Sequence, residues 1–335
     1  MTKNDLRIIF MGTPEFAVET LRALVENGYN VVAVVTQPDK PVGRHGSVLQ
    51  PSQVKQYALA HALPVLQPEK MKDPQFVEQL RSYEANLQVV VAFRMLPEIV
   101  WAMPEYGTFN VHAALLPQYR GAAPINWAVI NGETETGVTT FFLDHDIDTG
   151  RIILKKSFAI PDDADVEYVY DGLMHLGAQL CIETLEAIIA ADGHPVSIPQ
   201  QDISLTSHLS PVTSLKSAPK IFKETCEIDW TMTVKQVYDF IRGLSPVPGA
   251  WTTLVGPDGK ETVLKIYKSR KTDRQGLGSG VISTDGKNLY ISAGDTLLEI
   301  VELQLAGKKR MLARDFLNGM KNIELYQVKK NSTEI

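Results

Sequence analysis

The chain has 335 residues, of which 44% are hydrophobic, and this length favours two domains with ordinary soluble cores. It has no run of 18 apolar residues and no apolar stretch near the N-terminus that is long enough for a signal peptide, so we expect neither a membrane span nor secretion. The two cysteines, Cys181 and Cys226, form neither a disulfide framework nor a metal-binding spacing, which favours a cytoplasmic protein.

The formal net charge of −6 is distributed unevenly along the chain. Residues 1–200 contain 14 Lys and Arg against 24 Asp and Glu, whereas residues 201–335 contain 19 against 15. An acidic first part and a basic second part suggest that the second part contacts a polyanion. A chance difference between two solvated surfaces explains the same numbers equally well.

The first part of the chain alternates strands and helices. A short apolar run over 7–11 ends at the turn 12–14, a helical pattern follows over 15–27, and a second apolar run covers 31–36. This order predicts a parallel βαβ unit and an α/β domain with a Rossmann-like, mostly parallel sheet. The turn lacks the glycine spacing of a dinucleotide-binding loop, so we interpret it as a tight turn. The further elements predicted are helices over 54–62, 74–83, 124–130 and 166–191 and strands over 64–66, 87–92, 108–111, 137–143 and 151–157.

A long polar loop is predicted over 37–47, because this stretch holds two Pro and two Gly and shows no periodicity. It carries Lys40, Arg44 and His45. Loops of this length inside compact domains are often functional, although a surface loop whose charges have no role is the alternative.

Two polar side chains stand at the end of the strand predicted over 108–111. Asn110 and His112 are two residues apart, so on an extended chain they project to the same face. An amide that donates to a carbonyl oxygen and an imidazole that moves or stabilises charge can act on one carbonyl carbon. Taken alone, the pair is more often a set of ordinary polar groups near a turn.

A second polar stretch, residues 144–150, follows the strand predicted over 137–143. Its alternating aspartates suggest a calcium loop, but such a loop needs Gly at its sixth position and Glu at its twelfth, where this chain has Thr149 and Lys155. Two interpretations remain. Asp148 either bonds local backbone N–H groups in a turn or supplies a carboxylate that acts beside His112.

The second part of the chain has a different pattern. Residues 194–215 are rich in Pro, Ser, Gln and Thr without periodicity, and we interpret them as a linker. Residues 216–335 begin with a helix capped by Thr233 and continue with about five short strands separated by glycine turns. This pattern predicts a small OB-like β-barrel, a fold that commonly carries oligonucleotide sites.

Three adjacent cations, Lys308, Lys309 and Arg310, close the last predicted strand of the barrel. They are candidates for contacts with a polyanion, and a solvated loop is the alternative. The predicted domains are therefore 1–193, a linker over 194–215, and 216–335.

These motifs together resemble the formyltransferases that use 10-formyltetrahydrofolate. The resemblance rests on Asn110-Val111-His112, on Leu115-Leu116-Pro117 followed by residues 120–124, and on residues 146–150, and it covers nearly the whole chain. Within this family it is greatest to members that formylate the amino group of methionyl-initiator-tRNA in translation initiation. The resemblance implies that reaction, with 10-formyltetrahydrofolate as the donor, no metal and no covalent intermediate.

The resemblance also implies roles for individual residues. Asn110, His112 and Asp148 would be catalytic, Arg44 would reach the acceptor stem of the tRNA, and the barrel with residues 308–310 would bind tRNA in an enzyme that we expect to be a monomer. The folate pocket would lie beyond the carboxyl ends of the parallel strands. The folate-binding residues that the resemblance implies are Phe93, Met95, Leu96, Ala114, Leu115, Leu116, Pro117 and Asp146.

Three alternatives stay open from the sequence. A formyltransferase for glycinamide ribonucleotide would share the motifs but has no need of a basic barrel. A formyltetrahydrofolate hydrolase or a sugar-amine formyltransferase would share the first domain and carry a different extension. A nucleic-acid-binding protein without enzymatic activity would explain the barrel but would leave Asn110, His112 and Asp148 without a role.

Overall fold

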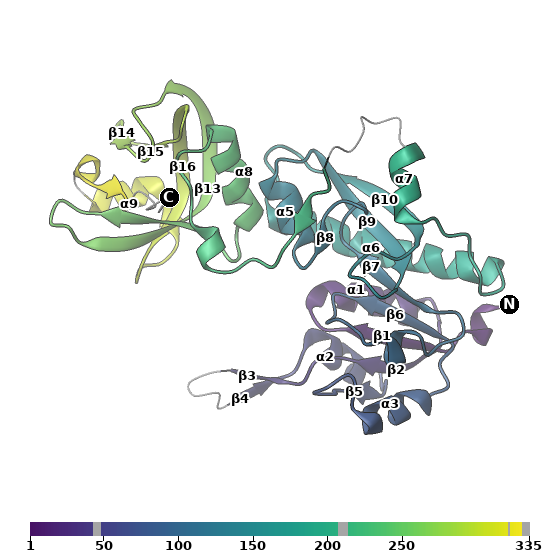
Figure 1. Ribbon diagram of the computed structural model, residues 1–335. Helices are drawn as coiled ribbons and strands as arrows, with labels where there is room; N and C mark the ends of the chain where they lie inside the picture. The colour runs from purple at the N-terminus through teal and green to yellow at the C-terminus, as the bar shows by residue number, and fades with distance from the viewer. Residues whose placement is uncertain (43–47, 207–213, 321, 330–335) are drawn as a thin grey trace. The chain divides into compact units, whose positions relative to one another are not determined.

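The computed structural model describes residues 1–42, 48–206, 214–320 and 322–329 (Figure 1). The chain forms two compact units. The first consists of residues 1–121, 136–159 and 170–217, and the second of 122–135, 160–169 and 218–335. The expected domain limits at 193 and 216 stay a prediction, because compactness does not show which segments fold on their own.

The first unit is built on a seven-stranded sheet in the order β10-β9-β7-β6-β1-β2-β5 (Figure 1). Strands β7, β6, β1, β2 and β5 are parallel, and β9 runs antiparallel to β7. Every residue of β1 and β6 is buried, as is typical of parallel strands covered on both faces. The predicted Rossmann-like, mostly parallel sheet is therefore confirmed. The strands are β1 Ile8–Gly12, β2 Val31–Val35, β5 Val65–Leu66, β6 Leu87–Val91, β7 Thr108–His112, β9 Glu135–Phe142 and β10 Ile152–Ala159.

One helix in the described part of the chain, α6, is long and apolar enough to cross a membrane by length and composition alone. Its residues Leu173, Leu185 and Ile188 are inaccessible to solvent, and the Thr184 hydroxyl lies 2.8 Å from the Thr140 hydroxyl on β9. These contacts are those of a core helix packed on the sheet of the first unit. The helices of this unit include α1 Glu15–Glu26, α2 Gln53–Ala60, α3 Pro74–Arg81, α4 Glu98–Trp101 and, from residue 170 onward, α6 Val166–Ala190, with a 3₁₀ helix over Lys3–Asp5.

The structure differs from the expectation of an irregular segment over 194–215. Residues Gln200–Thr206 form a helix, α7, and Ile198 makes an antiparallel bridge with Ile152. A helix this short shows too little of its period for a pattern to be recognised in the sequence, and tertiary contacts hold it instead.

Part of the polar loop predicted over 37–47 forms a strand: β3, Lys40–Val42, pairs with β4, Val48–Gln50, in a hairpin that extends from the body of the first unit (Figure 1). Arg44 and His45 lie outside the described residues.

The second unit contains an antiparallel sheet in the order β14-β15-β16-β13-β12-β18, with β17 paired to β16. A bridge between Val281 and Gln327 joins the two ends of this order, so the sheet is a nearly closed barrel. The predicted OB-like barrel is confirmed. The strands are β12 Ala250–Val255, β13 Glu261–Gln275, β14 Ile282–Thr284, β15 Leu289–Ser292, β16 Thr296–Leu305, β17 Met311–Leu312 and β18 Gln327–Val328. Further short elements in the described residues are β8 Arg120–Gly121, β11 Ser217–Ala218, α9 Ala313–Gly319 and 3₁₀ helices over Glu224–Cys226 and Ile323–Leu325.

The helix α8, Val234–Leu244, ties two earlier segments of the chain to the second unit. It begins with a capping box between Thr233 and Gln236 and packs against α5, Pro124–Ile130. On its buried face the Arg242 guanidinium pairs with the Asp239 carboxylate at 2.7 Å and donates to the Ala164 carbonyl at 2.9 Å. These contacts explain why residues 122–135 and 160–169 belong to the second unit.

Replacing Asp239 with Ala should destabilise the second unit by roughly 3–5 kcal/mol, because the buried Arg242 charge would lose its partner. Lys235→Ala is the matched control. Lys235 pairs with the same carboxylate, but its side chain is 58% exposed, so its loss should cost less than about 1 kcal/mol. Chemical denaturation followed by circular dichroism measures both variants. Equal losses would show that the buried pair contributes no more than the exposed one.

Candidate active site

Asn110 and His112 lie on β7, between β6 and β9. Asn110 is opposite Val90 and Phe141, and His112 is opposite Thr139. Because strand side chains alternate, both project from one face, as the sequence predicts. The Asn110 side-chain amide, half-buried, makes no hydrogen bond with any described residue, so its donor is available to a ligand.

The His112 ring is only 6% exposed, and a backbone carbonyl holds it. Its Nε2 lies 2.9 Å from the Tyr119 carbonyl oxygen, which can only accept, so Nε2 carries the hydrogen in this arrangement. Its Nδ1 lies 3.9 Å from Oδ2 of Asp148, which is an ion-pair distance and too long for a hydrogen bond. Tyr119 therefore orients the ring, and Asp148 places a negative charge beside it.

Asp148 arrives from the loop between β9 and β10. This loop begins at the opposite end of β7 from His112, where the Leu143 N–H donates to the Thr108 carbonyl at 2.8 Å. It then returns along the strand, and the Asp148 carboxylate accepts a hydrogen bond of 2.9 Å from the Gly121 N–H. The backbone N–H that the Asp148 carboxylate binds therefore belongs to Gly121, 27 residues earlier in the chain, and not to its own turn, and the carboxylate lies beside His112 as the second interpretation expects.

The shape of this loop is closely constrained. A Cβ on Gly150 would lie 1.7 Å from the Phe142 carbonyl oxygen, so only glycine fits there. The Thr149 hydroxyl donates to the Asp144 carboxylate at 2.7 Å. Asp148 itself has a left-handed backbone with φ of 55°, which is uncommon outside glycine. The surroundings therefore hold the loop in one strained conformation.

A side chain on β9 holds the backbone of the segment that follows β7. The Thr139 hydroxyl donates to the Ala114 carbonyl at 2.6 Å and accepts from the Leu116 N–H at 3.1 Å. Leu116 packs in a small buried cluster with Phe141 and Ile152. Ala114 and Leu116 are thus buried, and they shape the backbone rather than expose a side chain.

The residues implied for folate binding differ in their exposure. The segment after β6 lies at the same edge of the sheet as the segment after β7, because Val91 pairs with Val111 in parallel. There Leu96 is buried in a core cluster against which Phe93 packs, whereas Met95 is 71% exposed. Elsewhere among these residues, Leu115 and Pro117 are half-buried and Asp146 is exposed.

Sequence reasoning missed several residues that hold the site together. Tyr119 and Gly121 act through backbone groups, which every residue type possesses, so no side-chain signal marks them. Thr139 is one of several threonines in an apolar strand. Gln200 contacts the Asp148 loop from α7, in the segment interpreted as a linker.

The three cations predicted as polyanion contacts lie in the second unit and are not equivalent. Arg310 makes two hydrogen bonds to the Glu302 carboxylate, at 2.7 and 2.8 Å, and its guanidinium lies 4.3 Å from the Tyr267 ring centre. The hydrogen bond to Glu302 raises the pKa of Arg310. Lys308 and Lys309 are exposed, and neither pairs with a carboxylate among the described residues.

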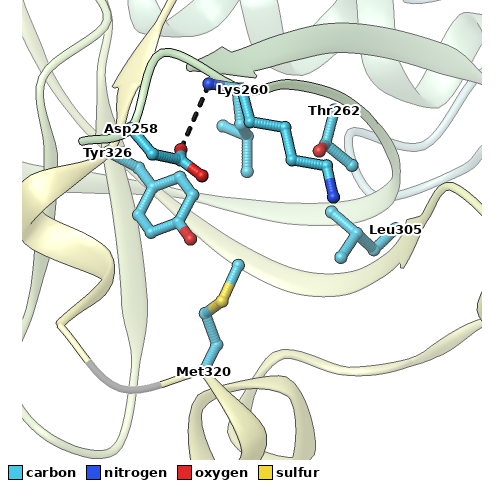
Figure 2. Close-up of a pocket in the computed structure, with 7 residues that line it drawn as sticks. Asp258, Lys260, Thr262, Leu305, Met320 and Tyr326 are labelled. Atoms are coloured by element: carbon cyan, nitrogen blue, oxygen red, sulfur yellow. Dashed lines mark hydrogen bonds between the residues drawn. The ribbon is translucent and has the colours of Figure 1, made fainter. Parts of the chain in front are cut away.

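The second unit also has a small pocket of about 190 Å³, with the Asp258, Lys260 and Tyr326 side chains at its wall (Figure 2). The Lys260 backbone N–H donates to the Asp258 carboxylate at 3.1 Å there, closing a local turn (Figure 2). No residue predicted to be catalytic lines it. In the described ranges no group of three or more His, Cys, Asp or Glu side chains could hold a metal ion.

Comparison with known proteins assigns both parts of the chain. Residues 6–185 match the formyl transferase family and residues 220–321 match the formyl transferase C-terminal domain. The methionyl-tRNA formyltransferase of Parabacteroides distasonis is 59% identical over 330 residues, covering 98% of this chain and 100% of the relative. The enzyme of the same name from Bacteroides fragilis is 57% identical over 331 residues, covering 98% of this chain and 99% of the relative.

Solved structures with the same fold are more distant in sequence. A sugar 3N-formyl transferase crystallised with dTDP and 5-N-formyl-THF has a TM-score of 0.60 and 20% identity, covering 91% of this chain and 99% of that one. HypX from Aquifex aeolicus in complex with tetrahydrofolic acid has a TM-score of 0.60 and 19% identity, covering 93% of this chain and 47% of that one. These two structures support the fold.

Replacing Thr139 with Val should destabilise the first unit by about 1–3 kcal/mol, because the buried Ala114 carbonyl and Leu116 N–H lose their partner. Thr136→Val on the same strand is the matched control. Thr136 is also buried, but its hydroxyl has no hydrogen-bond partner among the described residues, so this change should be neutral or stabilising. Denaturant unfolding compares the two variants, and equal free-energy changes would contradict this account of the segment after β7.

Proposed function

Since this chain belongs to the methionyl-tRNA formyltransferases, which transfer the formyl group of 10-formyltetrahydrofolate to the amino group of methionyl-initiator-tRNA, we propose that Asn110, His112 and Asp148 carry out the transfer. The main support is the geometry at β7. An unused amide donor, a buried imidazole and a carboxylate 3.9 Å from that imidazole meet in one place.

The proposed chemistry begins with attack by the amine lone pair on the formyl carbon. The carbonyl π electrons move to the formyl oxygen, and the Asn110 amide donates to the oxyanion that forms. The tetrahedral intermediate then collapses: the oxyanion electrons re-form the carbonyl as the bond from carbon to N10 of folate breaks, N10 takes up a proton and the former amine releases one. Asp148 receives the amine proton through water, and His112 stabilises charge and delivers a proton to N10. The proton held by Asp148 then replaces the one that the neighbouring His112 ring has lost.

Asn110→Ala, His112→Ala and Asp148→Ala should each lower the single-turnover rate of formyl transfer by about two to three powers of ten, the usual cost of losing an oxyanion donor or an acid–base group. His175→Ala is the control, since the His175 ring is exposed and pairs with the Glu19 carboxylate on α1. Near-native turnover in His112→Ala would show that the catalytic group is misassigned.

The folate pocket is proposed at the edge of the sheet formed by the segments after β6 and β7. Phe93, Met95, Leu115, Pro117 and Asp146 have accessible surface for direct contact. The buried Leu96, Ala114 and Leu116 would act through the backbone that they fix.

The barrel is proposed to supply phosphate contacts to tRNA through Lys308 and Lys309. Arg310 would contribute less, because its guanidinium is already held by Glu302. Arg44 remains a proposed contact to the acceptor stem on the resemblance alone. We also propose that the enzyme acts as a monomer in the cytoplasm, where a reducing environment suits its buried free cysteines.

The double variant Lys308→Ala, Lys309→Ala should weaken tRNA binding and reduce the slope of log affinity against log salt by roughly 0.7–0.9 for each phosphate that the protein no longer neutralises. Arg310→Ala should change the slope less. Lys287→Ala, which removes an exposed cation from another turn of the barrel, is the control. Affinities measured across a salt series test this, and an unchanged slope in the double variant would place the tRNA-binding surface elsewhere.

A further inference from the structure

Gln200 is the first residue of α7, and only 2% of the residue is exposed. Glutamine is seldom buried so completely, and a buried amide needs partners for both its ends. We propose that Gln200 is a positioning residue for formyl transfer, which holds Asp148 at His112. This inference rests on the proposed catalytic function of Asp148.

The nitrogen end of the Gln200 amide binds the backbone around Asp148. Nε2 donates to the Asp148 carbonyl at 2.8 Å and to the Gly150 carbonyl at 2.9 Å, which uses both of its hydrogens. These carbonyls lie on either side of Thr149, so one side chain fixes the turn at two points. The left-handed backbone of Asp148 persists only where its surroundings enforce it, and these two bonds do so.

The oxygen end binds the segment that holds the Asp148 carboxylate. Oε1 accepts from Nε and Nη2 of Arg120, at 3.1 and 2.6 Å. Arg120 directly precedes Gly121, whose N–H donates to Oδ2 of Asp148 at 2.9 Å. Gln200 thus completes a ring of hydrogen bonds. Its nitrogen fixes the backbone of the Asp148 turn, and its oxygen fixes Arg120, which is next to the Gly121 N–H that donates to the Asp148 carboxylate.

A purely structural role for Gln200, such as anchoring α7, makes a different prediction. An anchor would affect the enzyme whether or not residue 148 carries a carboxylate. A positioning residue affects the rate only through that carboxylate, so its contribution disappears once the carboxylate is removed. A double-mutant cycle between Gln200 and Asp148 separates the two roles.

Gln200→Leu should lower the single-turnover rate of formyl transfer by about ten- to a hundredfold, the scale for a catalytic group displaced by about 1 Å. The KM for methionyl-tRNA should change little. In the Asp148→Ala background the same substitution should change the rate by less than about twofold. Gln201→Leu, at the exposed neighbouring position, is the control and should keep the native rate.

A native rate in Gln200→Leu, or the same fold-loss with and without the Asp148 carboxylate, would overturn the proposal. Asp148→Ala alone retaining its rate would refute the catalytic assignment instead, so the two failures are distinct. If thermal melting shows that Gln200→Leu does not fold, Gln200→Glu replaces it. That variant keeps an acceptor for Arg120 and removes the donor to both loop carbonyls, so a native rate there would equally overturn the proposal.

Discussion

The hydrogen bond from the Gly121 N–H to the Asp148 carboxylate is the contact on which the proposed catalytic group depends. The loop that carries Asp148 leaves β9 beside Thr108, whereas His112 stands at the other end of β7. A carboxylate in such a loop comes to lie near the imidazole only if something holds it there. A backbone donor does this without titrating and without neutralising the charge, so the carboxylate stays available to His112.

Backbone groups also organise the rest of the site. The Tyr119 carbonyl orients the His112 ring, and Thr139 fixes the backbone at Ala114 and Leu116. Tyr119 and Asp148 both have left-handed φ values, 60° and 55°, in segments that meet at the site. Strain of this kind persists where the fold over-determines the backbone, and it keeps polar groups in place before a substrate arrives.

The features that could be predicted from the sequence are those that a repeating spacing of neighbouring residues indicates. Apolar runs indicate the parallel strands, and a spacing of two puts Asn110 and His112 on one face. The position of Asp148 is not encoded in this way, because the antiparallel β9 directs the following loop away from His112 before it returns. The role of Gln200 could not be predicted for a related reason. The helix α7 is too short to show periodicity in the sequence. The hydrogen-bond partners of Gln200 lie about 50 and 80 residues earlier in the chain.

Net charge along the sequence is a poor guide to the cations that a polyanion can use. Residues 201–335 have an excess of positive charge, but in the second unit Arg310 pairs with Glu302 and Lys271 pairs with Asp162. Asp162 is counted with the acidic first part of the chain, although it belongs to the second unit. A cation in such an ion pair can contact a phosphate and release its counterions only after the contact with the carboxylate is broken. The free energy lost with the ion pair offsets part of the free energy gained by binding the phosphate. The salt dependence of tRNA binding should therefore follow the exposed cations that have no carboxylate beside them, such as Lys308 and Lys309 in the described part of the barrel, rather than the formal charge of the domain.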